Sequence, residues 1–508
     1  MKLNKSEKMQ TTLNLFSGIM AMFVQIIVSF FLSPYIVKTL GEEANGFTQL
    51  ANNFVQYATL ITVAFNSMAG RFMSVSYHKG DVEQTKRYYS SIVVCNVIIS
   101  CFLIPIAIYI VAKLDTIVVI ENANIVDVKA LFICVFINFF ANLILSLYSL
   151  SMFVTNRIYI QNIFNLVRNI LNALILLVVF SVFPARLYYV SFVAMILTLV
   201  NIPIFKLYHF RLLPTIKFKK EMFSKFAVFE MLKSGIWNTV NQCGNMLMTG
   251  LDLLLANWFI SPGMMGVLSI AKIIPNAIIS LATVLNTSFA PALTINWAKD
   301  NENGVLTELR RNMKVSSVIV SIPIITFTVF SEKFYTLWMP SLDAKALAIL
   351  SFLTILSFIP WAGPQTLYNV FSVTNKLKVN SIAFIITGFL NVIIVYVLLK
   401  TTTLGVYAVA GVSSILSLGR NLIVIAPYTA KILKLKWYVF YKDVLISLGC
   451  CLINAIVGSS FHFMFAIHSW GNLIVAVLLT VIVTFGLDVC FVLNKNERNT
   501  MIKRIVRR

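Results

Sequence analysis

The amino-acid sequence predicts an all-α polytopic membrane protein of about 14 transmembrane helices. We expect two pseudo-symmetric six-helix bundles around a central cavity, with two C-terminal helices added. Composition is the first reason: 59% of the 508 residues are hydrophobic and only 12% are charged, whereas about a quarter of a soluble protein is charged. Secondly, apolar runs of about 20 residues recur along the whole chain, and their length favours helices over barrel strands. The third reason is an internal repeat.

The apolar runs divide the chain in order, and a basic segment separates the first six expected helices from the rest. The expected spans are 12–37, 48–70, 90–112, 128–152, 159–181, 187–208, 234–258, 265–290, 314–331, 346–370, 379–399, 405–427, 443–463 and 471–493. The predicted domains are an N-terminal six-helix bundle at 1–210, a basic cytoplasmic linker at 211–233, a C-terminal six-helix bundle at 234–430, and helices 13–14 with a basic cytoplasmic tail at 431–508. No connection has room for a soluble ATPase or an extracytoplasmic catalytic domain.

The repeat is visible in two separate registers. VTNRIYIQN at 154–162 recurs as VTNKLKVNS at 373–381, an offset of 219 residues. The interval from Gly46 to Lys79 matches that from Gly266 to Lys299 at an offset of 220 residues. An even number of helices in each copy keeps both copies in the same orientation, so we expect a parallel repeat with its axis along the membrane normal.

The net charge of +22 would suit a nucleic-acid partner, but the distribution of the charge argues against one. Most of the 41 Lys and Arg residues fall in loops that the span assignment places on one side of the membrane. This asymmetry follows the positive-inside rule and predicts a cell (inner) membrane protein with both termini cytoplasmic. The apolar stretch after the basic N-terminus runs too long for a signal peptide, so we expect a retained first helix.

No arrangement of residues predicts catalysis, a cofactor or a metal site. The seven cysteines lie in or beside apolar segments without zinc-like spacing. The four histidines are far apart, and neither GxxxxGK[ST] nor HExxH occurs. We therefore expect no enzyme and no ATP-driven transport on this chain.

A polar stripe on an otherwise apolar span is the main indication of a functional cavity. At 100° per residue, six polar side chains between residues 238 and 252 fall within about 100° of one another. They are Asn238, Asn241, Gln242, Asn245, Thr249 and Asp252. Such a stripe is expensive against lipid, so we expect it to face a water-filled cavity or protein.

Two further spans carry similar stripes. One contains Asn165, Arg168 and Asn172, and the other contains Lys272 and Asn276. The alternative is that these amides only join helices by hydrogen bonds. Arg168 lies near the midplane, where a lone charge needs a partner or water. It either binds an anionic head group, which a guanidinium grips bidentately, or makes structural bonds to carbonyls.

Four other features keep two interpretations each. Asp252 and Lys272 lie at similar depth on consecutive spans, so they either form a structural pair or serve as an ion-coupling site and a phosphate contact. Arg420 either contacts substrate or extends to the interface. Asp488 is expected to be an interfacial carboxylate. WAGP at 361–364 is either a hinge or a static kink.

At this point the sequence resembles the multidrug/oligosaccharidyl-lipid/polysaccharide (MOP) exporter superfamily, and within it the bacterial polysaccharide (O-antigen type) flippases. The segments that carry the resemblance are SPYIVKTLGEEANGF at 33–47, RFMSVSYHKGD at 71–81, GLDLLLANWFISPGMMGVLSIAK at 250–272 and FAPAL at 289–293. The residues Val267 and Leu268 depart from the aromatic expected after Gly266.

The resemblance implies a flippase that moves an undecaprenyl-pyrophosphate-linked oligosaccharide from the cytoplasmic to the outer face by alternating access. Its partners would be the lipid-linked oligosaccharide, membrane lipid and a coupling ion, H+ or Na+, or the membrane potential. A cationic, amide-lined cavity suits an anionic pyrophosphate with polar sugars.

Three alternatives stay open at this stage. A multidrug exporter of the same superfamily should have an acidic, aromatic cavity rather than Arg168, Lys272 and Arg420. A lipid II flippase would share the two added helices and the basic cavity. A membrane glycosyl polymerase or ligase would need a sizeable extracytoplasmic loop, and the longest candidate is 113–127.

Overall fold

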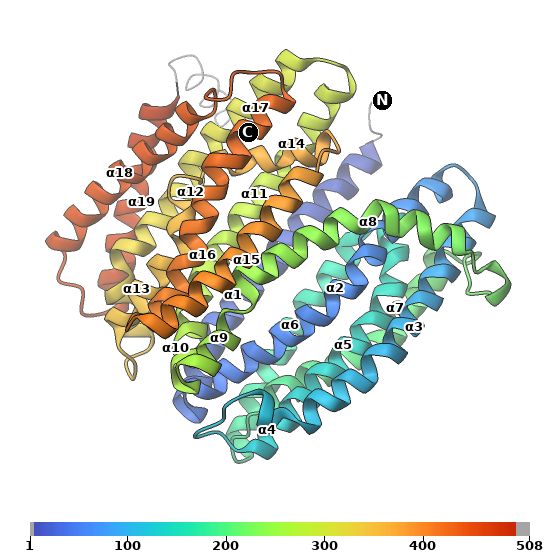
Figure 1. The fold of residues 1–508 in the computed structure, drawn as a ribbon, viewed down its shortest axis with the longest axis horizontal. Coiled ribbons are helices and arrows are strands. Elements are labelled where there is room, and N and C mark those ends of the chain that lie inside the picture. Colours follow the sequence, from blue (N-terminus) through green and yellow to red (C-terminus); the bar gives the residue numbers. More distant parts are fainter. Residues whose placement is uncertain (1–4, 494–508) are drawn as a thin grey trace. The chain divides into compact units, whose positions relative to one another are not determined.

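The computed structural model describes residues 5–493, with the side chains of residues 5–8, 11, 12, 15 and 64 left out of the description. This part of the chain contains helices, turns and loops but no strand. The all-α prediction is therefore confirmed (Figure 1).

The first half of the described chain contains six long helices and one short one. They are α1 (Lys5–Leu40), α2 (Glu42–His78), α3 (Val82–Ala112), α4 (Leu114–Ile117), α5 (Ile125–Val154), α6 (Ile158–Val182) and α7 (Tyr189–Leu212). Side chains begin several of these helices: Asp81 accepts the Gln84 N–H at 2.8 Å, and Asn124 accepts the Val126 N–H at 2.9 Å. Such caps satisfy amide groups that the first turn of a helix leaves open.

The second half is more interrupted than the first. Its elements are α8 (Lys225–Asn245), the π-helical segment η2 (Met246–Gly250), α9 (Asp252–Phe259), α10 (Pro262–Ala271), α11 (Ile273–Ala298), α12 (Glu302–Trp338), α13 (Ala344–Ile355), η3 (Leu356–Phe358), η4 (Pro364–Leu367), α14 (Tyr368–Val373), α15 (Lys378–Thr401), α16 (Val406–Arg420), the π-helical segment η5 (Asn421–Ile425), α17 (Ala426–Ile432), α18 (Tyr441–Met464) and α19 (Trp470–Val492). A 3-10 turn, η1 (Lys220–Met222), lies in the basic linker.

Eleven segments of residues 5–493 are long and apolar enough to cross a membrane, so the protein is a multi-pass membrane protein. Three of the predicted spans are absent from this set. Of these, the second coincides with α2, which carries many amides, and the seventh and tenth coincide with the interrupted stretches 225–259 and 344–373. The number 14 stays a prediction.

The chain forms two compact units. The first comprises the residues up to Met246 together with Leu253–Gly266, and the second comprises Leu247–Asp252 and the residues from Val267 onward. In the first unit α5 packs between α3 and α7, and α8 packs against α2 and α3. The domain boundaries drawn from the repeat stay a prediction.

The first unit contains a close approach between the two glycines that the repeat equates. A Cβ atom on Gly46 of α2 would lie 2.8 Å from Met265 Cε and 3.0 Å from Gly266 Cα, and one on Gly266 would clash with the Glu42 carbonyl. Next to this contact the buried Glu43 carboxylate accepts the Glu121 N–H at 3.1 Å. The segment GEEANGF therefore packs tightly because it has no side chain at its sixth position.

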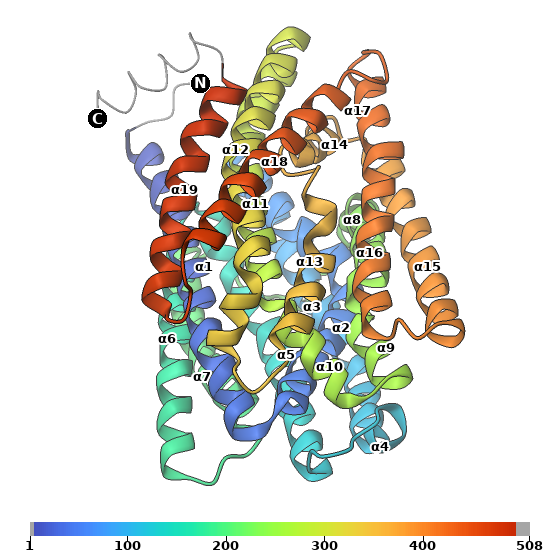
Figure 2. The same ribbon diagram turned by 90° about the vertical axis from the view of Figure 1, so that its left-hand side faces the viewer.

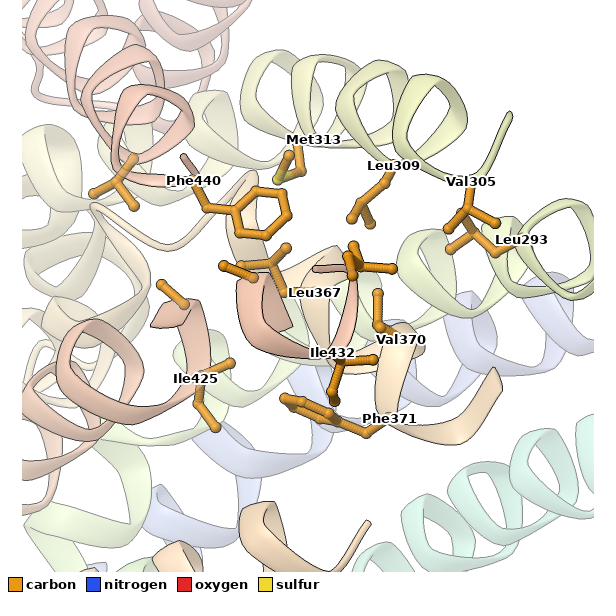
Figure 3. Packing of buried hydrophobic residues seen from close by; sticks show 14 of the residues in the cluster. Leu293, Val305, Leu309, Met313, Leu367, Val370, Phe371, Ile425, Ile432 and Phe440 are labelled. Atoms are coloured by element: carbon orange, nitrogen blue, oxygen red, sulfur yellow. The ribbon is translucent and has the colours of Figure 1, made fainter. Parts of the chain in front are cut away.

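In the second unit α12 is the central helix and contacts α11, α13, α18 and α19. Figure 2 shows α15 and α16 lying side by side, and α18 beside α19. Figure 3 shows an apolar cluster of this unit, in which Leu309 and Met313 of α12 lie near Leu367 and Phe440. This packing holds the interrupted segments of the unit in place.

Candidate functional site

The polar stripe predicted for residues 238–252 is interrupted in the structure. Helix α8 ends at Asn245, η2 follows, and α9 begins at Asp252. A π turn contains more residues than an α turn, so the 100° periodicity does not continue through it. The prediction of one continuous stripe was therefore wrong: Asn238, Asn241 and Asn245 belong to the first unit and Asp252 to the second.

A side chain from another helix stabilises the π-helical segment η2. The Asn391 side-chain amide of α15 donates to the carbonyls of Leu247 and Met248, each at 3.1 Å. Asn391 is fully buried. The sequence analysis did not single out Asn391 as part of the site, although it lies in a segment matched by the repeat.

Asp252, directly after η2, forms an ion pair with Lys272. The Asp252 side chain is only 1% exposed, and the ammonium group of Lys272 also lies 3.5 Å from the Thr249 carbonyl oxygen. The second carboxylate oxygen of Asp252, Oδ1, has no hydrogen-bond partner. The pairing that the equal depth of the two residues suggested is thus present.

Pro275 explains why the chain bends at Lys272. Proline has no N–H to donate to the carbonyl four residues earlier, so the Ala271 carbonyl loses its helical partner. The buried Ser351 hydroxyl replaces that partner at 2.8 Å, and the Tyr335 hydroxyl lies at 3.4 Å. Neighbouring hydroxyls commonly satisfy such carbonyls inside membranes. Asn276, one residue beyond the proline, is exposed.

Arg420 ends α16, and the structure places it inside the second unit. The residue is 6% exposed, and its guanidinium lies 3.5 Å from the centre of the Phe384 ring. One nitrogen, Nη2, donates to the Tyr368 hydroxyl at 3.3 Å, and that hydroxyl donates to Asn421 Oδ1 at 2.6 Å. The alternative in which Arg420 extends to the interface was therefore wrong, because Phe384 and Tyr368 hold it within the helix bundle.

The Arg420 guanidinium is only partly satisfied. Its Nε and Nη1 atoms are buried without a hydrogen-bond partner, and no carboxylate of residues 5–493 lies within ion-pair distance. The carbonyl of Leu422 in η5 accepts a hydrogen bond from the Tyr441 hydroxyl at 2.7 Å. Chemically, this is a desolvated cation with two free donors.

Arg168 lies on the regular helix α6 of the first unit and is half-buried. Its Nη1 atom lies 3.5 Å from the Thr198 hydroxyl of α7, at the limit of a hydrogen bond. The described part of the chain offers it no carboxylate within ion-pair distance. Asn165 and Asn172 are half-buried on the same helix, and the Asn172 carbonyl oxygen Oδ1 has no partner.

Two further predictions can be compared with the structure. Asp488 is completely buried on α19, so its interpretation as an interfacial carboxylate was wrong: α12 and α18 both pack against α19 and enclose it. WAGP at 361–364 interrupts the helical stretch and is buried, and a Cβ atom on Gly363 would clash with Ser317 of α12. Among residues 5–493, no three His, Cys, Asp or Glu side chains are grouped to hold a metal ion.

The predicted site residues thus form three separate groups in the described structure. Asp252 and Lys272 form one group, Arg420 with its aromatic partners forms the second, and α6 carries the third. Each charged group adjoins a bend or a π-helical segment except Arg168.

Comparison with known proteins agrees with this architecture. The chain matches the family described as "Polysaccharide biosynthesis protein" over residues 12–297, more than half its length. It is 26% identical over 503 residues to the uncharacterized membrane protein EpsK of Bacillus subtilis (strain 168), covering 98% of both chains.

Two solved structures have a similar fold. The lipid II flippase MurJ in an inward closed conformation has a TM-score of 0.67 and 14% identity, covering 98% of this chain and all of that one. An inward-facing multidrug resistance MATE family transporter of the MOP superfamily has a TM-score of 0.64 and 12% identity, covering 82% of this chain and 98% of that one. The resemblance to the MOP superfamily is confirmed, and the chain belongs to the polysaccharide biosynthesis protein family.

Proposed function

We propose that this protein is a flippase that moves an undecaprenyl-pyrophosphate-linked oligosaccharide from the cytoplasmic to the outer face of the cell membrane. Membership of the polysaccharide biosynthesis family and the MOP transporter fold support a flippase or exporter. One observation favours an anionic substrate: Arg420 is a buried guanidinium with two unpartnered nitrogens and no carboxylate within ion-pair distance among residues 5–493.

The chemistry of the guanidinium explains this choice of substrate. An isolated charge inside a membrane protein is expensive unless something compensates for it. A planar guanidinium binds phosphate oxygens through parallel hydrogen bonds, and Arg420 has Nε and Nη1 available for them. A cationic drug would instead be repelled. Arg168, half-buried and without a carboxylate partner in the described chain, offers a second cation from the first unit.

The amide side chains are proposed to contact the sugars. Asn165 and Asn172 lie on α6 beside Arg168, Asn238, Asn241 and Asn245 lie on α8, and Asn276 lies on α11. An amide both donates and accepts, so it can bind hydroxyl groups of different stereochemistry. The unpartnered Oδ1 atom of Asn172 is an example of an acceptor available for this purpose.

Energy for transport is proposed to enter at Asp252. A proton or Na+ that binds its carboxylate would compete with Lys272 and release that lysine for the substrate pyrophosphate. Moving one charge through a membrane potential of 100 mV supplies about 2.3 kcal/mol. The exchange would link the ion to the head group, with both termini on the cytoplasmic side.

The test is replacement of each arginine by Ala and by Lys in the parent cell, at matched protein level in the membrane. We expect Arg420→Ala and Arg168→Ala to abolish surface polysaccharide and to leave lipid-linked oligosaccharide on the cytoplasmic face. The Lys variants should retain part of the display because they keep the charge. Arg186→Ala is the matched control, since Arg186 is exposed and pairs with Asp127 at 3.5 Å. Full display with both Ala variants would contradict the proposal.

A lipid II flippase is the second candidate. The observation that favours it is that the MurJ structure covers 98% of this chain whereas the MATE structure covers 82%. Complementation distinguishes the two candidates: this chain should fail to support growth of cells depleted of their own lipid II flippase. Growth of those cells would favour lipid II as the substrate.

A further inference from the structure

A fully buried polar cluster lies where α12, α18 and α19 meet, apart from the candidate site residues discussed above. Its centre is Asp488 of α19, with Ser321 of α12 and Asn454 of α18 beside it. All three side chains are completely inaccessible to solvent. Polar groups this deep need internal partners, since water cannot supply them.

The hydrogen bonds of the cluster form a short chain that ends at the carboxyl group. The Asn454 side-chain amide donates to the Ser321 hydroxyl at 3.0 Å, and this hydroxyl lies 3.4 Å from Asp488 Oδ2. The hydroxyls of Thr480 and Thr484 instead donate to carbonyls of their own helix at 2.8 and 2.7 Å. The carboxyl group therefore receives few donors.

Two oxygen atoms of the cluster have no partner. They are Asp488 Oδ1 and Asn454 Oδ1, and both are buried. An acceptor cannot satisfy another acceptor, so the cluster lacks one donor. Leaving two such atoms bare in the interior costs about 1–3 kcal/mol each, and more if the carboxyl group is charged.

No cation of the described chain compensates Asp488. The titratable groups that face it are the thiols of Cys450 and Cys451 on α18, and α12 contributes only the neutral Ser321. No Lys, Arg or His of residues 5–493 lies within ion-pair distance of its carboxyl group. An isolated carboxylate in these surroundings would be unpaired and dry, which is costly.

We propose that Asp488 is a proton-binding site and carries a proton in this structure, donating it to Asn454 Oδ1. A single proton removes the charge and converts one carboxyl oxygen into the missing donor. Both unpartnered atoms are then satisfied at once. The proton would join α19 to α18, while Ser321 joins both helices to α12.

The proposal gives the C-terminal helix pair a role of its own. When the proton leaves, Asp488 becomes a buried anion and the contact with Asn454 changes from attractive to repulsive. The packing of α18 and α19 on α12 is therefore linked to protonation, at a site formed by different residues from Asp252 and Lys272. This inference does not depend on which substrate the protein carries.

Infrared spectroscopy of the full-length protein in detergent tests the proposal directly. Subtracting the spectrum of Asp488→Asn from that of the wild type should reveal the C=O band of a protonated carboxylic acid, with the shift that deuterium oxide causes in such a group. Asp343→Asn is the matched control, because Asp343 is an exposed helix cap and Asn caps equally well. The control difference should lack this band. A difference spectrum with carboxylate bands in place of the acid band would overturn the proposal.

Thermal melting provides the second measurement. Because Asn resembles a neutral acid in shape, Asp488→Asn should melt within about 2 °C of the wild type. Asn454→Leu should keep the acid band but shift its frequency, since the acceptor is lost, and this holds even if Asp488→Asn does not fold. Stabilisation of the wild type by Na+ but not by choline, absent in Asp488→Asn, would show that a metal ion occupies the site and would contradict a proton.

Discussion

The two π-helical segments of the second unit are alike in construction and opposite in charge. Asp252 follows η2, and Arg420 precedes η5. In each segment a side chain from another helix binds backbone carbonyls: Asn391 of α15 does so in η2, and Tyr441 of α18 does so in η5. Asp252 has an ion-pair partner, Lys272, whereas no carboxylate of residues 5–493 pairs with Arg420.

This difference shows how one kind of helix irregularity can serve two purposes. A π-helical segment redirects the residue beside it and is often found at functional sites. At η2 the charges compensate each other, so the site is closed until an ion or a substrate displaces a partner. At η5 the cation is already held in place by Phe384 and Tyr368, and its orientation requires little further ordering when an anion binds.

The largest effect is expected when the paired site is made to resemble the unpaired one. Lys272→Met leaves the buried Asp252 carboxylate alone and should destabilise the protein by about 3–5 kcal/mol. Asp252→Asn together with Lys272→Met should recover most of this loss, because neither charge then remains. Denaturant unfolding in detergent measures both, and equal stability of the single and double variants would contradict a compensated pair.

Asn391 tests whether η2 depends on its neighbour. Asn391→Leu removes two hydrogen bonds and leaves the Leu247 and Met248 carbonyls without their side-chain donor, so we expect a loss of about 2–3 kcal/mol. Thr387→Val on the same helix is the control, since its hydroxyl bonds only within α15. The control should change the free energy of unfolding by about 0.5 kcal/mol or less. An equal loss in both variants would mean that Asn391 acts only through packing.

The corresponding change at η5 should be smaller. Tyr441→Phe removes a single hydrogen bond, to the Leu422 carbonyl, and keeps the ring, so we expect about 1 kcal/mol. Melting of the purified protein measures this value beside that of Asn391→Leu. A loss larger than that of Asn391→Leu would reverse the order of the two segments.

Arg420→Met should have the smallest effect on stability and a large effect on transport. Methionine has similar length and no charge, so it removes an unsatisfied buried cation, and stability should stay within about 1 kcal/mol of the wild type or rise. Surface display of polysaccharide should nevertheless be lost. Strong destabilisation would show that Arg420 is mainly structural, through its contacts with Phe384 and Tyr368.

Much of the architecture could be predicted because it depends on local composition. Long apolar runs identify helices directly, and the equal depth of Asp252 and Lys272 follows from the rise of 1.5 Å per residue. A helical break at a proline is likewise a local property, as Pro275 illustrates. These predictions require no knowledge of which helices are neighbours.

The remainder depends on contacts between distant parts of the chain. The π-helical segments could not be read from periodicity, since Asn391 and Tyr441 are provided by other helices. Arg420 could be assigned to an interface or a cavity, and only the placement of Phe384 and Tyr368 decides against the interface. Asp488 looked interfacial from its position in α19, because nothing local shows that α12 and α18 enclose it.

The contact between Gly46 and Gly266 has a consequence for the origin of the protein. Positions that the repeat equates touch each other, and neither has room for a side chain. In an ancestor with one copy of the repeat, the same glycine would have met its counterpart in a second, identical chain, as residues on the axis of a twofold dimer do. Gene fusion would have turned this contact between two molecules into a contact within one. Each glycine could then change separately, so that Gly46→Ala and Gly266→Ala test the same ancestral contact from its two sides.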